Sequence, residues 1–231
     1  MIEQKIEPSL KQGEKEISYD KKIERICAIY DKDKKIAAFI SPLNKELATD
    51  YASELAKIHN LIPHVSWSKN EIIADEINGR EFPYKWDLSQ ILLSPEDNKT
   101  PIGFSIAYFR VASADFVPFN SVYLHRGAIL AAYQHRGVGK AMVSYALSNA
   151  FDFVSKHQDL FLGDAEHRVT MQTNDEPSNR EKIGLYRGLG GVPIGRKQYL
   201  DKMDIILGFS HSSLINSELF QESADLIKPL I

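Results

Sequence analysis

The chain has 231 residues, of which 43 % are hydrophobic and 26 % charged, and its formal net charge is −3. This composition is typical of a folded domain, and the length suits one large domain or one domain with an extension. The small negative charge gives no general signal for binding nucleic acid or an anionic membrane surface. Because Cys27 is the only cysteine, no internal disulfide can form.

The sequence does not predict a membrane-spanning segment or a secretory signal. No apolar run approaches the roughly 18 residues that cross a bilayer, and the N-terminal segment lacks the apolar stretch of a secretory signal. We therefore expect a soluble, cytoplasmic protein with neither a membrane nor a nucleic acid as partner.

The first third of the chain combines a polar arm with short strands and helices. Residues 1–22 are rich in Glu and Lys, which indicates an N-terminal arm. The segments 26–31 and 36–41 are apolar and flank a polar turn, so they predict a hairpin. Apolar residues at helical spacing predict helices over 44–60 and 68–79, each with a capping residue at its start.

The remaining elements alternate between strands and helices. We expect, in order, strands at 86–93, 102–111 and 121–130, a helix at 137–156, a strand at 167–173, a helix at 179–189 and a strand at 198–209. Simple alternation in the third strand places Tyr123, His125, Gly127 and Ile129 on one face. The prediction is an α/β (α+β) fold with a mixed, largely antiparallel twisted sheet flanked by helices. The main domain spans 23–209, and a tail at 210–231 contains a short helix.

One heptad, Gln134-His135-Arg136-Gly137-Val138-Gly139-Lys140, lies between the third strand and the longest helix. Glycine lets a backbone approach a ligand closely, and the first amides of a helix attract anions. The heptad therefore predicts a phosphate cradle. It is not a P-loop, because Gln134 and Ala141 stand where that motif needs Gly and Ser or Thr. It is not a dinucleotide fingerprint either, because Met142 replaces the third Gly.

A different pattern, Gln/Arg-x-x-Gly-x-Gly/Ala, does match residues 134–139. A second block downstream, Asn179 followed by Leu185-Tyr186 and Leu189-Gly190, fits Asn-x-x-x-x-x-Leu-Tyr-x-x-Leu-Gly. With these two blocks the chain resembles the GCN5-related N-acetyltransferase (GNAT) superfamily, over roughly residues 25–209. The resemblance implies that acetyl-coenzyme A is the co-substrate.

The resemblance also implies roles for particular residues. The backbone of Gly127, Ala128 and Ile129 would hold the pantetheine arm, and the side chain of Asn179 would help to hold the cofactor. The pyrophosphate would be bound by the amides of His135, Arg136, Gly137, Val138, Gly139 and Lys140. Tyr186 would be the general acid that protonates the departing thiolate, because its phenol has a pKa close enough to that of a thiol.

The sequence does not identify which group acts as the general base. Many members of the superfamily have a Glu on the strand before the cradle, and Tyr123 occupies the equivalent position here. His125 is our candidate base, since an imidazole titrates in a suitable range. Asp175, Glu176 and a chain of water molecules are alternatives.

The predicted activity is transfer of an acetyl group to a primary amine by direct attack in a ternary complex. The amine belongs to a small molecule or a protein, and the protein is expected to be a monomer or homodimer. The alternative is a coenzyme A-binding sensor or interaction module without catalysis. The seven histidines show no ligand spacing, so no metal is expected.

Overall fold

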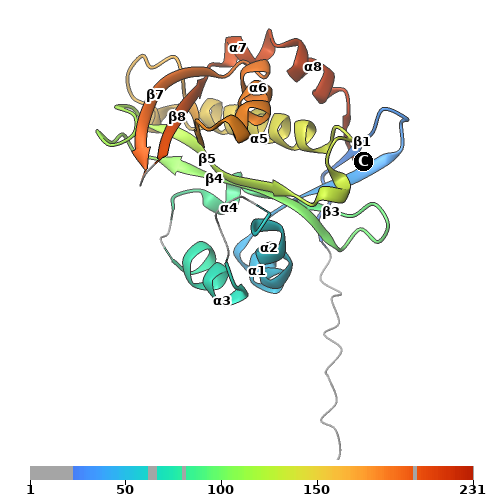
Figure 1. Ribbon diagram of the computed structural model, residues 1–231. Coiled ribbons are helices and arrows are strands. Elements are labelled where there is room, and N and C mark those ends of the chain that lie inside the picture. Colours follow the sequence, from blue (N-terminus) through green and yellow to red (C-terminus); the bar gives the residue numbers. More distant parts are fainter. Residues whose placement is uncertain (1–22, 62–66, 80–81, 200–201, 231) are drawn as a thin grey trace, which may run out of the picture.

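The computed structural model describes residues 23–61, 67–79, 82–199 and 202–230, and it is built around one twisted sheet with helices on both faces (Figure 1). The strands follow the order β7-β8-β6-β5-β4-β3-β2-β1-β9 across the sheet. They are β1 (Cys27–Tyr30), β2 (Ile36–Pro42), β3 (Gln90–Leu93), β4 (Pro101–Arg110), β5 (Ser121–Ile129), β6 (Val169–Asn174), β7 (Val192–Tyr199), β8 (Lys202–Phe209) and β9 (Ile227–Pro229). The predicted N-terminal arm at 1–22 lies outside the described residues.

The helices form two layers. The layer below the sheet in Figure 1 contains α1 (Lys45–Asp50), α2 (Ala52–His59), α3 (Lys69–Glu71), the π-helical turn η1 (Ile72–Ile77) and α4 (Lys85–Leu88). The layer above it contains α5 (Val138–Lys156), α6 (Arg180–Gly188), α7 (His211–Ile215) and α8 (Glu218–Ala224). Short 3₁₀ turns lie in the connections at η2 (Ala131–Tyr133), η3 (Gln158–Leu160) and η4 (Pro177–Asn179).

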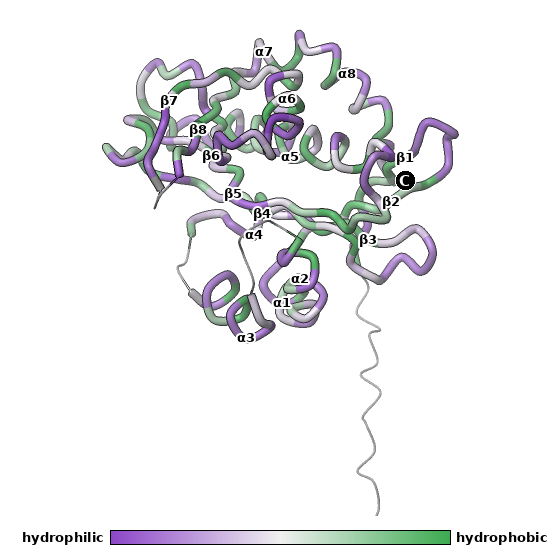
Figure 2. Tube along the Cα trace, viewed as in Figure 1, coloured by the Kyte–Doolittle hydropathy of each residue, from purple (hydrophilic) through white to green (hydrophobic). Residues whose placement is uncertain are grey.

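Each layer has its own core. Above the sheet, Leu147 and Phe151 of α5 pack on Val122 and Val169 of the strands. Below it, the helices α1 and α2 pack on β2, β3 and β4 around Phe104. The hydropathy view shows these apolar strands between more polar helix surfaces (Figure 2). The predicted class, a mixed and largely antiparallel sheet between helices, is therefore confirmed.

Strand pairing follows the prediction where the sequence signals were strong. The β1–β2 hairpin and the β3–β4 pair are antiparallel, as expected. Among the described strands, β5 and β6 form the one parallel pair, because the long helix α5 carries the chain across the upper face between them.

Some expected elements were wrong in detail. The helix over 44–60 is divided at Tyr51, and the helix over 68–79 continues from α3 into a π-helical turn. The expected strand over 86–93 is half helix, because Tyr84 adopts a left-handed conformation (φ 58°) and turns the chain into α4. The strand β7 was missed, and it forms a hairpin with β8.

The segment after Phe209 joins the main body. It forms α7, α8 and β9, where a single short helix was expected, and β9 pairs with β1 at the far edge of the sheet. Ser223 of α8 lies with its hydroxyl 2.5 Å from that of Ser144 on α5. The C-terminal segment therefore packs on α5, and its strand β9 pairs with β1, which would otherwise be an edge strand of the sheet.

Candidate active site

The central feature of the site is a split between β5 and β6. The two strands pair only where Val122–Leu124 lie beside Val169–Met171, and beyond that point β6 continues alongside β8. The Leu130 amide donates to the Ile102 carbonyl of β4 at 2.8 Å. Because successive amides of a strand point to opposite sides, the amides of Ile129 and Gly127 point away from β4, toward the split.

A β-bulge in β5 lies at the closed end of the split. Ile106 pairs with Arg126 and Ala107 with Leu124, so His125 is the extra residue. The bulge reverses the alternation of side chains that follows it. Tyr123 therefore packs below the sheet with Tyr108, whereas Ile129 packs above it with Val138. The expected common face for Tyr123, His125, Gly127 and Ile129 was wrong for this reason.

The predicted phosphate cradle is a loop with alternating backbone conformations. His135 and Gly137 have positive φ angles of 57° and 82°. Such alternation turns successive amides toward one point and forms an anion-binding nest. Over the described chain, no backbone oxygen accepts from the amides of residues 135–140, and the first bond after the loop runs from the Ala141 amide to the Gly137 carbonyl. Gln134 fixes the loop to the strand by donating to the Ile129 carbonyl at 3.0 Å.

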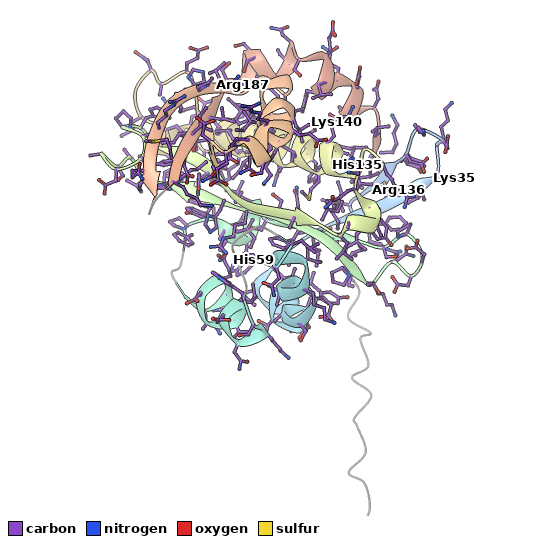
Figure 3. All side chains as sticks on the ribbon, viewed as in Figure 1. Lys35, His59, His135, Arg136, Lys140 and Arg187 are labelled. Atoms are coloured by element: carbon purple, nitrogen blue, oxygen red, sulfur yellow. The ribbon has the colours of Figure 1, made fainter. Side chains whose placement is uncertain are left out.

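The surroundings of the cradle are positively charged but partly neutralised. Figure 3 shows His135, Arg136 and Lys140 grouped at the start of α5. The Lys140 ammonium lies 3.1 Å from the carboxylate of Glu222 on α8, and the Arg136 guanidinium lies 3.8 Å from that of Asp31. Among the described residues, apart from its two chain neighbours and the nearby backbone of α5, nothing lies within 4 Å of the position that a Cβ on Gly139 would take, so this side of the loop is open.

The second sequence block lies above the sheet. Asn179 is the N-cap residue of α6, but its side chain does not cap the helix. Tyr186 packs at the edge of the upper core. Burial raises the pKa of the Tyr186 phenol to about 12. The phenol is therefore fully protonated near neutral pH, as a proton donor must be.

Below the sheet, a buried carboxylate joins three elements, η1, α4 and β5. Glu76 of η1 is 6 % exposed. Its Oε2 lies 3.2 Å from Nζ of Lys85, and its Oε1 lies 3.4 Å from Nε2 of His125 and 3.3 Å from Nε of Arg126. Burial alone would raise the pKa of Glu76, but the hydrogen bond with His125 and the charges around it lower the pKa to about 2. Arg126 also reaches His59 of α2, at 2.5 Å.

Sequence reasoning did not single out Glu76 or His59. The helix that carries Glu76 was predicted only from its isoleucines, and nothing in a single sequence pairs residue 76 with residue 125. The structure adds a signal for Glu76, because this residue lies in a π-helical turn and such turns are frequent at functional sites.

The other candidate bases lie elsewhere. Asp175 forms an ion pair with Arg196 at 3.4 Å, and Glu176 forms one with Lys202 at 3.0 Å. The Tyr123 phenol is buried, and burial raises its pKa well above the ordinary value. Two of these groups are held in ion pairs and the third is a buried phenol, so His125 stays our preferred candidate for the general base.

The geometry fits coenzyme A and gives no indication of a metal. The nest offers free amides to a pyrophosphate, and the split exposes strand amides to an extended pantetheine arm. Within residues 23–61, 67–79, 82–199 and 202–230, no group of three or more His, Cys, Asp or Glu side chains could hold a metal ion. In the same ranges no helix is long and apolar enough to cross a membrane.

Comparison with known proteins finds relatives by structure only. No family model and no curated protein matches the sequence. A putative GnaT-family acetyltransferase from Bordetella pertussis superposes with a TM-score of 0.55 at 15 % identity, covering 75 % of this chain and 95 % of that one. The NatC complex bound to Gag peptide and CoA gives 0.53 at 16 % identity, with coverages of 75 % and 98 %.

A third structure agrees with these two. NAA60 from Arabidopsis thaliana, in complex with acetyl-CoA, gives a TM-score of 0.51 at 15 % identity and covers 74 % of this chain and 98 % of its own. The chain therefore has the fold of the GNAT acetyltransferases.

Proposed function

We propose that the protein is an N-acetyltransferase that uses acetyl-coenzyme A and transfers the acetyl group to a primary amine. The observation that carries this proposal is the pairing of a split sheet with an amide nest. The nest at 135–140 provides free donors for two phosphates at the N-terminus of a long helix. The split exposes the Gly127 and Ile129 amides beside it.

Each group of the chain has a role in this proposal. The nest amides, Arg136 and Lys140 bind the pyrophosphate, and Asn179 helps to hold the cofactor. The Ile129 amide donates to the thioester carbonyl and stabilises the negative charge that develops there. When bound, acetyl-coenzyme A supplies an activated acyl group with a thiolate leaving group.

The Tyr186 phenol donates its proton to the departing sulfur. A pKa of about 12 keeps that proton in place until the sulfur becomes basic. No covalent intermediate on the chain is needed, because the amine attacks the carbonyl directly. The acceptor is an amine of a small molecule or a protein.

The experiment is a thiol-release assay with acetyl-coenzyme A and a broad panel of amines. We expect turnover with at least one amine. Tyr186→Phe should lower kcat at least tenfold while the affinity for coenzyme A stays nearly unchanged. Tyr145→Phe is the matched control, since burial also raises the pKa of that tyrosine to about 12, on α5.

A binding module without catalysis is the second candidate, and the absence of a carboxylate on β5 favours it. Both candidates should be stabilised by coenzyme A. Binding without turnover across the panel would support the module, and an absence of binding would remove both.

A further inference from the structure

Below the sheet, a cavity of about 440 Å³ lies beside η1, α4 and the first residue of α1. The segment 82–87 lines it together with Ile77 and Lys45. An isoleucine, a proline and three aromatic rings make its walls largely apolar, and the Phe82 ring is stacked on that of Tyr108 of β4, with centroids 4.0 Å apart. Sites for small molecules typically have volumes of about 300–1,000 Å³, so the cavity has the size of such a site.

The most buried charged group in the wall is the ammonium of Lys85, a residue that is 4 % exposed. Its Nζ lies 5.7 Å from the centroid of the Phe82 ring and 5.1 Å from that of Trp86. An ammonium has three N–H donors, and two of them bond to Glu76, one to its backbone carbonyl and one to Oε2 at 3.2 Å. In the part of the chain that the structure describes, the third donor has no hydrogen-bond partner, so it is available to a ligand in the cavity.

The buried charges around Lys85 do not balance. The Glu76 carboxylate faces two cations, Lys85 at 3.2 Å and Arg126 at 3.3 Å. His59 and His125 add no charge near neutral pH, because burial lowers the pKa of each imidazole, that of His59 to about 4. The cluster therefore has one positive charge in excess, and an unpaired charge in a buried site is costly. An anionic group in the cavity would compensate it.

The other charges of the wall do not change this balance. Lys45 and Asp87 both line the cavity and are both exposed, so they have opposite signs and are screened by solvent. A cationic ligand on the aromatic rings would meet the ammonium of Lys85, which already lies against two of them. The cavity therefore favours a ligand with one negative group and an apolar body.

Glu76 also connects the cavity to the closed end of the split. Its Oε2 contacts Lys85, and its Oε1 lies 3.4 Å from Nε2 of His125, the extra residue of the bulge in β5. A single carboxylate group thus separates Lys85 from this end of β5. In an α-amino acid the amine and the carboxylate are attached to the same carbon atom, so a carboxylate held at Lys85 keeps the amine close to β5. The excess positive charge also lowers the pKa of a nearby ammonium, which favours the neutral amine that attacks.

We propose that the cavity holds the acceptor, and that the acceptor is a small amine with a carboxylate and an apolar side chain, as in an aromatic α-amino acid. The inference rests on the proposed acetyltransferase function. Lys85 donates to the carboxylate, and the aromatic walls contact the side chain. The ammonium loses one proton to solvent, and the neutral nitrogen attacks the thioester carbonyl. The C–N bond forms as the C–S bond breaks, Tyr186 gives its proton to the sulfur, and the second proton of the nitrogen is released to water, which reprotonates the Tyr186 oxygen.

Thiol release with three acceptors tests the acceptor class. Phenylalanine has both groups, phenylalanine amide lacks the negative charge, and alanine lacks the ring. We expect kcat/KM for phenylalanine to be at least about tenfold higher than for either of the other two. The amide has the less basic amine and therefore more of the neutral form, so basicity cannot produce this preference. Equal values for phenylalanine and its amide would overturn the inference while the proposed function stood.

The variant Lys85→Met removes the ammonium and keeps a side chain of similar length. It should reduce the preference for phenylalanine over its amide to less than about threefold, while the preference over alanine stays high. Lys57→Met removes an exposed lysine of α2 that does not line the cavity, so it is the matched control and should keep both preferences. A Lys85→Met protein that kept the wild-type preference for the carboxylate would contradict the inference.

A binding measurement does not depend on turnover. In calorimetry with the wild-type protein, phenylacetate should bind at least about tenfold more tightly than phenethylamine or acetate. The chain has two tryptophans, of which Trp86 lines the cavity. Phenylacetate should therefore change the fluorescence of Trp67→Phe, in which Trp86 is the reporter, but not that of Trp86→Phe.

The outcomes of the binding measurement separate the inference from the proposed function. Equal binding of phenethylamine, or a fluorescence change in Trp86→Phe alone, would overturn the inference. If phenylacetate bound beside Trp86 but no amine were acetylated, the proposed function would fail and the carboxylate site would remain.

Discussion

His59 should make the protein sensitive to mild acid. The side chain is 1 % exposed, and the Arg126 guanidinium lies 2.5 Å from its Nε2. Burial and then the positive charge of Arg126 lower the pKa of His59 from 6.5 to about 4. The folded protein therefore keeps His59 neutral at pH values where the unfolded chain already binds a proton.

The sign and size of the effect follow from this difference. Above pH 6.5 neither state protonates His59, so its contribution is constant. As the pH falls from 6.5 to about 4, the unfolded chain takes up a proton that the folded protein refuses, and the free energy of unfolding decreases. A fall of the pKa from 6.5 to about 4 corresponds to about 3 kcal/mol.

Urea denaturation at several pH values between 7 and 4.5 would measure this. We expect the wild type to lose most of that amount, and His59→Gln to lose much less, because the amide oxygen can accept from Arg126 without titrating. His211→Gln, at an exposed position of α7, is the control and should keep the wild-type slope. Equal slopes in the wild type and His59→Gln would refute the reasoning.

Two further predictions concern the cradle. Gly137→Ala forces a φ of 82° on a residue with a Cβ, which would lie 3.3 Å from Leu226, so unfolding free energy should fall by about 1–2 kcal/mol. The Cβ of Gly139→Ala would meet no neighbour in the part of the chain that the structure describes, so this variant should be at least as stable as the wild type in the same denaturation experiment, and equal losses in the two variants would contradict the argument. Glu222→Gln frees Lys140 from a 3.1 Å ion pair, so calorimetry should show coenzyme A binding about 2–5 times more tightly with nearly unchanged stability. Glu218→Gln, at an exposed position of the same helix, is the control, and an equal gain there would mean that only net charge matters.

Local patterns in the sequence were enough to predict the sheet class, the loop between β5 and α5 and the helix α6. The heptad at 134–140 and the block from Asn179 depend on short-range geometry, which a single sequence contains. The bulge at His125 could not be predicted, because it arises from pairing with β4 and shifts every later side chain to the other face.

Long-range contacts were beyond the same reasoning. The ion pairs of Glu76 join η1 to β5 and to Lys85, and no periodic pattern signals them. The strand β9 has three residues, which is too short for alternation to be recognised. The apolar run at 86–93 is equally ambiguous, since a short run can be part of a helix or a strand.

The short parallel pairing of β5 with β6 divides the sheet into two halves that meet at three residue pairs. One half carries the cradle, His125 and the strand amides, and the other carries Asn179 and Tyr186 just after and beyond β6. The proposed base and acid therefore belong to different halves, and the angle at the junction sets the distance between them. Because β9 pairs with β1, the C-terminal segment stabilises the half of the sheet that is formed by the N-terminal strands. Removal of β9 should therefore loosen the half of the sheet that carries the cradle, while β6 and β8 stay paired. A change at this edge of the sheet would then alter the junction between β5 and β6.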